Sequence, residues 1–315
     1  MNLKEYQQLR AEKTTLERLL AKIPAGREIE KLGFEQRLQE VVEVLGGIEA
    51  PTRTPVQTRL TFRGRAVVGS YGLFAKFGGE VVGAFSEAVA AVGASQARPL
   101  GSRGVLPSQD DFRLMITGTA QGSFGFQLEE APRDSQMLFP PDPPLEPAIE
   151  QVKQIISTTL GTDDELTEAL ADTDPRALES IRKFLDVLAK NESICAMEFQ
   201  GDVFRFKDVA QVRRSLERLH TDNIHEGEVV LVGAFLGALP KHRRFEFQPT
   251  DSEEYISGGI QKELESVSEI NSLVGDPMEI RVHTRRVGTG NPNYTLLGYS
   301  PHSLDLPDEG PSVDD

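Results

Sequence analysis

Two basic clusters near the C-terminal end have the residue types and spacing of an anion-binding surface. In the first, alternate residues of an extended segment are basic and one more follows: Arg281, His283, Arg285 and Arg286. The second surrounds a predicted turn: Lys241, His242, Arg243 and Arg244. If one small barrel carries both clusters, they could form a single positive face that binds nucleic acid or an acidic partner. The simpler interpretation is an outward face that its charges keep soluble.

The overall charge weighs against nucleic acid. The 315 residues include 34 basic and 49 acidic side chains, which gives a formal net charge of -15. A field of this sign opposes the approach of a phosphate backbone. An acidic protein is a further candidate for the basic clusters, and so is the acidic end of this chain, with Asp305, Asp308 and Glu309.

The sequence contains no recognisable pattern for a metal or a cofactor. The five histidines include no pair with H-E-x-x-H spacing, and a single cysteine leaves no C-x-x-C. His220 and His225 lie close in sequence with Asp222 between them, but they have too few accompanying ligands for a metal site. No glycine-rich stretch matches a phosphate-binding loop. We therefore predict no metal and no cofactor.

Candidate nucleophiles are equally few. Cys195 falls on a predicted strand without a neighbouring base to lower its pKa, which indicates a buried structural thiol. The sequences around Ser102 and Ser123 do not match G-x-S-x-G, and carboxylate pairs are too common in so acidic a chain to indicate a site. We interpret the chain as a binding, scaffold or regulatory component rather than an enzyme. An enzyme of unrecognised type stays an alternative.

Residues 1–50 are predicted to form a helical hairpin with a short coiled-coil seam. Apart from a polar break at Lys13, the seam of the first helix consists of Tyr6, Leu9, Leu16, Leu20 and Ile23. A second apolar stripe follows from Phe34 to Ile48. Because so short a seam is marginal by itself, we expect self-association or the docking of a partner helix, or else packing on the chain's own domain.

The clearest structural signal is a β-hairpin from Phe112 to Glu129, where apolar residues alternate on both sides of a short glycine-containing link. Two strands, at residues 56–63 and 66–69, and an amphipathic helix at 73–94 precede it. The order predicts a ββαββ domain over residues 55–130, with a four-stranded antiparallel sheet and a covering helix. Glycines inside that helix indicate a close approach to the sheet: Gly78, Gly79 and Gly83.

The remaining segments differ in composition. Residues 131–147 are rich in proline and predict a stiff linker or, alternatively, a ligand for an SH3-like partner. Residues 148–225 are predicted to form helices and one β-hairpin. Residues 226–300 read as five short strands with one interrupting helix, which predicts a small closed barrel of OB or SH3-like type. The acidic residues 301–315 are predicted to be disordered.

The fold class that follows is α+β in several parts. A single cysteine, no apolar N-terminal signal and no run near the roughly 18 apolar residues of a membrane span predict a cytoplasmic protein without membrane contact. The expected partners are further copies of the chain, another protein, or both. Nucleic acid is the second choice.

Overall fold

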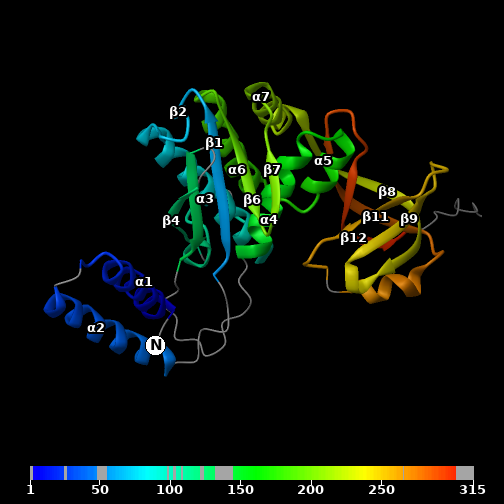
Figure 1. Cartoon of the computed structure of the whole chain (residues 1–315). Coiled ribbons are helices and arrows are strands. Elements are labelled where there is room, and N and C mark those ends of the chain that lie inside the picture. Colours follow the sequence, from blue (N-terminus) through cyan, green and yellow to red (C-terminus); the bar gives the residue numbers. More distant parts are fainter. Residues whose placement is uncertain are drawn as a thin grey trace, which may run out of the picture. The chain divides into compact units, whose positions relative to one another are not determined.

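The computed structural model describes residues 3–24, 27–47, 55–97, 99–101, 104–107, 109–120, 124–131, 145–264 and 266–302. The fold is α+β, as predicted (Figure 1). It divides into two compact units, unit 1 with Met1–Val152 and Lys190–Lys207, and unit 2 with Lys153–Ala189 and Asp208–Asp315. Most of the predicted linker and the acidic tail from residue 303 lie outside the described residues, so those expectations stay predictions.

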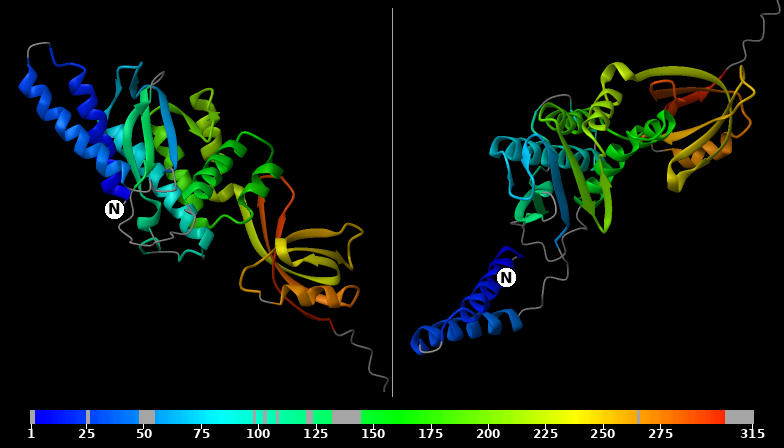
Figure 2. Two further views of the ribbon diagram at one scale, coloured as in Figure 1. Left: turned by 60° about the horizontal axis from the view of Figure 1, so that its bottom comes forward. Right: turned by 45° about the horizontal axis from the view of Figure 1, so that its top comes forward.

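The N-terminal residues form the predicted helical hairpin. Helices α1 (Leu3–Leu20) and α2 (Glu28–Gly46) lie side by side in both views of Figure 2. Arg37 of α2 donates Nε to one carboxylate oxygen of Glu12 at 2.8 Å and Nη2 to the other at 3.2 Å. A bidentate pair of this kind fixes the register between the helices, and its hydrogen bonds lower the pKa of Glu12.

Unit 1 is built on a five-stranded sheet with the order β4-β5-β1-β6-β7. Its strands are β1 (Gln57–Gly64), β4 (Leu114–Ala120), β5 (Phe124–Glu130), β6 (Ser193–Phe199) and β7 (Asp202–Arg205). Both predicted hairpins are confirmed, because β4 pairs with β5 and β6 pairs with β7. The four-stranded ββαββ sheet is wrong, because β1 pairs with β6 from the later hairpin.

The predicted strand at residues 66–69 is short and lies elsewhere. Its residues form β2 (Val67–Val68), which pairs with β3 (Gly72–Leu73) in a separate two-stranded sheet. Strand β6 offers seven residues, most of them buried, whereas β2 offers two. The longer strand makes more ladder hydrogen bonds and buries more apolar surface, so it takes the place beside β1 despite its distance in sequence.

Helix α3 (Ala75–Ala97) covers one face of this sheet, as predicted (Figure 1). The ring of Phe77 meets that of Phe62 on β1 edge-on, with centroids 5.5 Å apart. Among the described residues, α3 is also the one helix long and apolar enough to cross a membrane, but 61% of that window is buried inside the protein. The burial is that of a core helix, so its length is weak support for a membrane span.

Close packing explains only one of the three glycines singled out in this helix. A Cβ on Gly78 would lie 2.5 Å from a leucine side chain, but nothing lies within 4 Å of a Cβ on Gly79 or Gly83. A fourth glycine has the tightest contact on α3. A Cβ on Gly93 would lie 2.0 Å from the ring of Phe112, so this position must lack a side chain.

Four helices follow in the middle of the chain: α4 (Leu145–Thr158), α5 (Asp163–Leu170), α6 (Pro175–Lys190) and α7 (Val209–Arg218). Helix α4 begins inside the segment predicted as a linker at 131–147. Helix α5 starts with a capping box, in which Thr162 and Glu165 bond each other's backbone N–H. Short 3₁₀ helices are η1 (Gln109–Phe112), η2 (Thr221–Asn223), η3 (Pro240–His242) and η4 (Val267–Leu273).

Unit 2 contains a sheet that closes on itself. Its strands are β8 (Ile224–Leu239), β9 (Arg244–Pro249), β10 (Ile256–Ile260), β11 (Met278–Val287) and β12 (Asn293–Pro301). They form a closed barrel in the order β10-β12-β11-β8-β9, in which only the β10–β12 pair is parallel. Phe235, Phe245 and Phe247 lie in its core. The pairing does not by itself confirm an OB or SH3-like type.

Candidate interaction surfaces

Arg285, one of the predicted binding residues, is buried. Its Nε donates to Glu226 Oε1 at 2.6 Å, and its Nη1 donates to the carbonyl of Thr173 at 2.7 Å and to the carbonyl of Leu170. The side chain points outward from β11, as alternation predicts, but α5 and the turn after it cover it. Arg285 is therefore corrected from a binding residue to a residue that holds α5 on the closed sheet.

Arg243 also has a structural position. It takes a left-handed backbone conformation at φ 48° at the start of β9. Its guanidinium donates to the carbonyls of Ile260 at 3.2 Å, of Leu264 at 2.8 Å and of Gln261. These bonds tie the β8–β9 turn to the loop after β10, and they occupy donors that a ligand would need.

The other predicted basic residues do not form one face. Arg281 lies opposite Val230 on β8, whereas Arg244 lies opposite Leu239 on the same strand. These two β8 positions are nine residues apart, which is roughly 30 Å along an extended strand. Lys241 and Arg244 thus lie at one end of β8, while Arg281, His283 and Arg286 lie along its other half.

Carboxylates are interleaved with the second of these groups. His283 lies opposite Glu228 and Arg285 lies opposite Glu226. Glu279 precedes Arg281 on β11 by two residues, so it lies on the same face. The outward face of β8 and β11 is consequently mixed in charge, although Arg281 on this face is exposed.

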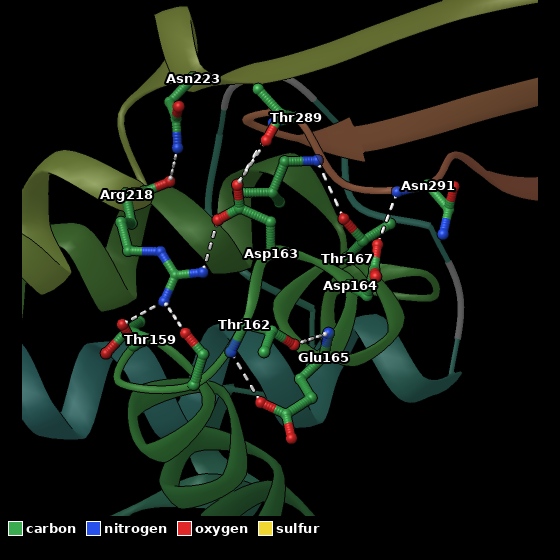
Figure 3. Close-up of polar contacts among 12 residues, drawn as sticks. Thr159, Thr162, Asp163, Asp164, Glu165, Thr167, Arg218, Asn223, Thr289 and Asn291 are labelled. Carbon is green, nitrogen blue, oxygen red and sulfur yellow. Dashed lines mark hydrogen bonds and ion pairs between the residues drawn. The ribbon is translucent and has the colours of Figure 1, made fainter.

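Figure 3 shows a polar junction within unit 2 that sequence patterns did not predict. Every second backbone N–H from Val287 to Asn291 donates to a side chain of α5: Val287 to Thr167 Oγ1 at 3.0 Å, Thr289 to Asp163 Oδ2 at 3.2 Å, and Asn291 to Asp164 Oδ1 at 2.6 Å. The β11–β12 loop is therefore held along one side of α5. We call this arrangement the α5 latch.

Arg218 completes the α5 latch from the end of α7. Its Nη2 lies 2.7 Å from Asp163 Oδ1, and its Nη1 donates to the carbonyls of Thr159 and Gly161 (Figure 3). The Arg218 bond lowers the pKa of Asp163, and the N–H of Thr289 lowers it further. Since this carboxylate is held ionised by donors on two sides, it serves as a fixed acceptor rather than as a proton-transfer group.

Two glycines make room for the latch. Gly288 has φ +53°, and a Cβ there would lie 2.5 Å from Asp163 Oδ2. A Cβ on Gly290 would lie 2.9 Å from Asp164 Oδ1. The Gly-Thr-Gly sequence in this loop is the local signal that indicates a close approach by another group.

The predicted self-association residues are only partly covered within the hairpin. Leu16 is buried, whereas the rest of the seam is half-buried: Tyr6, Leu9, Leu20 and Ile23. On α2, Val41 is buried and its apolar neighbours are half-buried or exposed. The hairpin thus covers the centre of its seam and leaves the edges in contact with solvent.

Unit 1 also exposes apolar surface around a hollow at the start of α3. The hollow has a volume of about 370 Å³ and is lined by Leu73, Ala75, Gly78, Gly79, Val82, Ile116, Phe124 and Phe126. Ile116 is 56% exposed, and Phe74, between two lining residues in sequence, is 58% exposed. An exposed apolar surface of this kind favours contact with another protein over contact with a polyanion.

The residues considered for metal binding or catalysis do not converge. His220 Nδ1 lies 3.3 Å from Asp222, but no group of three His, Cys, Asp or Glu side chains suited to a metal occurs among the described residues. Cys195 is buried, and this burial raises the pKa of its thiol to about 12. A thiol with so high a pKa is not a nucleophile at neutral pH.

Strand pairing assembles one polar surface that sequence reasoning missed. The solvent face of the unit 1 sheet carries Arg59, Arg63 and Arg205, because β1 and β7 both flank β6. The alternation of polar and apolar residues from Gln57 to Arg63 indicates that β1 has a polar face. Nothing local indicates that β7, more than 130 residues later, adds to it.

Comparisons with known proteins add no family to this geometry. No protein-family model matches the chain, and no curated protein or solved structure matches it.

Proposed function

We propose that this chain is a non-enzymatic binding or scaffold component that acts through protein–protein contacts, with α1–α2 as the site of self-association. The observation that carries the proposal is the incompletely covered seam. Among the residues of the hairpin whose side chains are described, only Leu16 and Val41 are buried, whereas Leu19, Val42 and Val44 are 40%, 42% and 47% exposed.

The physical argument concerns the stability of the hairpin. Isolated helices of this length are marginal in water, and two helices that bury so few side chains gain little from each other. A second hairpin packed along the open edges would cover the half-buried residues of both copies. Four helices around a shared apolar core form a stable bundle, and a twofold axis lets the same surface serve both copies.

The mass of the full-length chain tests this proposal. Light scattering should give at least twice the 34.7 kDa of the chain at about 50 µM, a concentration at which micromolar affinities are saturated. Leu20→Glu places a charge in the seam and Leu19→Glu places one at its exposed edge, so both should reduce the mass. Ala11→Glu adds the same charge on the exposed side of α1 and should leave the mass unchanged.

Circular dichroism distinguishes loss of association from loss of the hairpin. Because Leu19 is already exposed, its substitution should preserve the helical signal at low protein concentration. The proposal would be abandoned if the unsubstituted chain were monomeric at this concentration, or if Ala11→Glu reduced the mass as much as Leu19→Glu.

The second candidate function is nucleic-acid binding by the closed sheet, which we propose to be of OB type. Three features support this assignment: the first-second-third-fifth-fourth order of its strands around the ring, the parallel pairing of the third strand with the fifth, and the short helix between the third and fourth. OB-type barrels bind oligonucleotides with their second and third strands and the adjoining loops.

Two observations place nucleic acid second. Arg243 and Arg285 already bond backbone carbonyls of unit 2. The loop after β11 is engaged by carboxylates in the α5 latch. Titration with a fluorescent single-stranded oligonucleotide at increasing salt tests this function. Binding that weakens steeply with salt, and is lost in a Lys241→Glu/Arg244→Glu variant, would favour it over the scaffold proposal.

A further inference from the structure

Hydrogen-bond donors from two strands surround Ala196 of β6 on the solvent face of the unit 1 sheet. Thr61 of β1 and Arg205 of β7 lie on either side of Ala196. Arg63 lies opposite Ile194, two residues further along the same face. Because Leu60 and Phe62 are fully buried, the alternating residues of β1 between and after them point away from the core.

These donors have no partner within the part of the chain that the structure describes. The side chains of Arg63 and Arg205 and the hydroxyl of Thr61 form no hydrogen bond or ion pair with any described residue. The other arginines near them behave differently. Arg59 lies 3.6 Å from Glu198, and Arg65 lies 3.6 Å from Glu192. In a chain with 49 acidic and 34 basic residues, the two unpaired guanidinium groups stand out on this face.

A shallow hollow lies between the unpaired donors. It is lined by Thr61, Arg63, Ile194, Cys195, Ala196 and Arg205, and its volume of about 10 Å³ is close to that of one buried water. No carboxylate lines it. Two strand spacings and two residues of rise place the Cα atoms of Arg63 and Arg205 roughly 12 Å apart, so both long side chains can reach a group bound over β6.

We propose that Arg63 and Arg205 bind the phosphate group of a phosphate monoester above this hollow, which itself has room for about one water. A guanidinium offers paired N–H donors in a planar fork that matches phosphate oxygens, and two such groups approach here from opposite sides. The hydroxyl of Thr61, which lines the hollow, supplies a further hydrogen-bond donor. A phosphate monoester carries close to two negative charges and three strong acceptor oxygens, so it can use all three side chains at once.

A nucleic-acid backbone fits the hollow less well. No aromatic side chain lines it, and aromatic platforms carry much of the affinity for single strands. The net charge of -15 also opposes a long polyanion, whereas a single phosphate feels mainly the nearby guanidinium groups. A small sugar phosphate and a phosphorylated serine present the same chemistry here.

Titration of the ¹⁵N-labelled full-length chain, followed by amide correlation spectra in phosphate-free buffer, tests the proposal. The probes are glucose 6-phosphate, a short phosphoserine peptide and its unphosphorylated form. Either phosphorylated probe should shift the amide resonances of β1, β6 and β7, and the shift should saturate at probe concentrations below about 50 mM. The unphosphorylated peptide should cause no such shift. The phosphorylated probe with the higher affinity decides whether the site takes a sugar phosphate or a phosphorylated serine.

Matched variants separate a built site from general attraction. Arg63→Gln and Arg205→Gln should each weaken binding about tenfold, the loss expected for a charge-assisted hydrogen bond. Arg59→Gln and Arg65→Gln remove the same charge nearby and should change affinity less than about twofold. Equal losses in all four variants, no saturable shift with either phosphorylated probe, or tighter binding of a single-stranded oligonucleotide at the same amides would overturn the proposal.

Discussion

The carboxylate of Asp163 lies 2.7 Å from the guanidinium of Arg218, and this pair joins the first residue of α5 to the last residue of α7. The same carboxylate accepts the N–H of Thr289 from the β11–β12 loop. One acidic side chain thus connects two helices and the closed sheet of unit 2, so its substitution tests how these elements stabilise that unit.

Asp163→Asn should lower the free energy of unfolding by about 1–2 kcal/mol at pH 7, because it removes a charge-assisted bond that is still partly exposed to solvent. Urea unfolding followed by tyrosine fluorescence measures the change. Three of the five tyrosines, Tyr255, Tyr294 and Tyr299, lie in unit 2. Asp251→Asn, at an exposed turn, is the control and should have no effect beyond about 0.5 kcal/mol.

The same pair predicts a pH dependence. The pKa of Asp163 is lower in the folded chain than its ordinary value of 3.8, so the stabilisation is complete above that value and is lost as pH falls through the folded pKa. The stability difference between the native chain and Asp163→Asn should therefore be constant near neutral pH and shrink below about pH 3.8. A difference that grows on acidification would contradict the assigned ion pair.

Arg285 provides a test of its corrected role. Arg285→Ala leaves buried carbonyls and Glu226 without their donor, so we expect a loss of about 3 kcal/mol in the stability of unit 2. Arg285→Lys should restore little of it, since an ammonium cannot supply the fork of donors. Arg281→Ala, on the exposed face of the same strand, should cost less than about 0.5 kcal/mol. If Arg281→Ala were the more damaging change, the assignment would be wrong.

The glycines of α3 should respond in opposite directions. Gly93→Ala should destabilise unit 1 by about 1–3 kcal/mol, because the new Cβ overlaps the ring of Phe112. Gly83→Ala places a methyl group in open space and should stabilise the helix by about 0.5–1 kcal/mol. Thermal unfolding followed by circular dichroism compares the two, and equal effects would mean that Gly93 is not packed as described.

Cys195 should be unreactive in the folded chain. With its pKa raised to about 12 by burial, almost no thiolate is present at pH 8, so a maleimide should label it only after unfolding. The chain has one cysteine, so the mass of the product reports this site alone. Complete labelling in guanidinium is the control, and rapid labelling without denaturant would show that β6 opens readily.

Local sequence patterns were enough for the parts of the fold that depend on neighbouring residues. The three-and-four spacing of the seam residues between Tyr6 and Leu20 predicted α1, and the alternation of apolar residues between Phe112 and Glu129 predicted β4 and β5. Both patterns report how one element divides its side chains between core and solvent. They contain no information on which distant element supplies the other half of the contact.

Tertiary structure decided the rest. The sequence alone determined that the chain is α+β, that its early residues form a helical hairpin and that Arg285 points outward from its strand. Only the fold could decide that β6 lies beside β1, that α5 covers Arg285, and that Thr61 and Arg205 lie on either side of Ala196. The reason is physical: a side chain's orientation follows from its own backbone, whereas its burial and its partners depend on segments that meet only when the whole chain has folded.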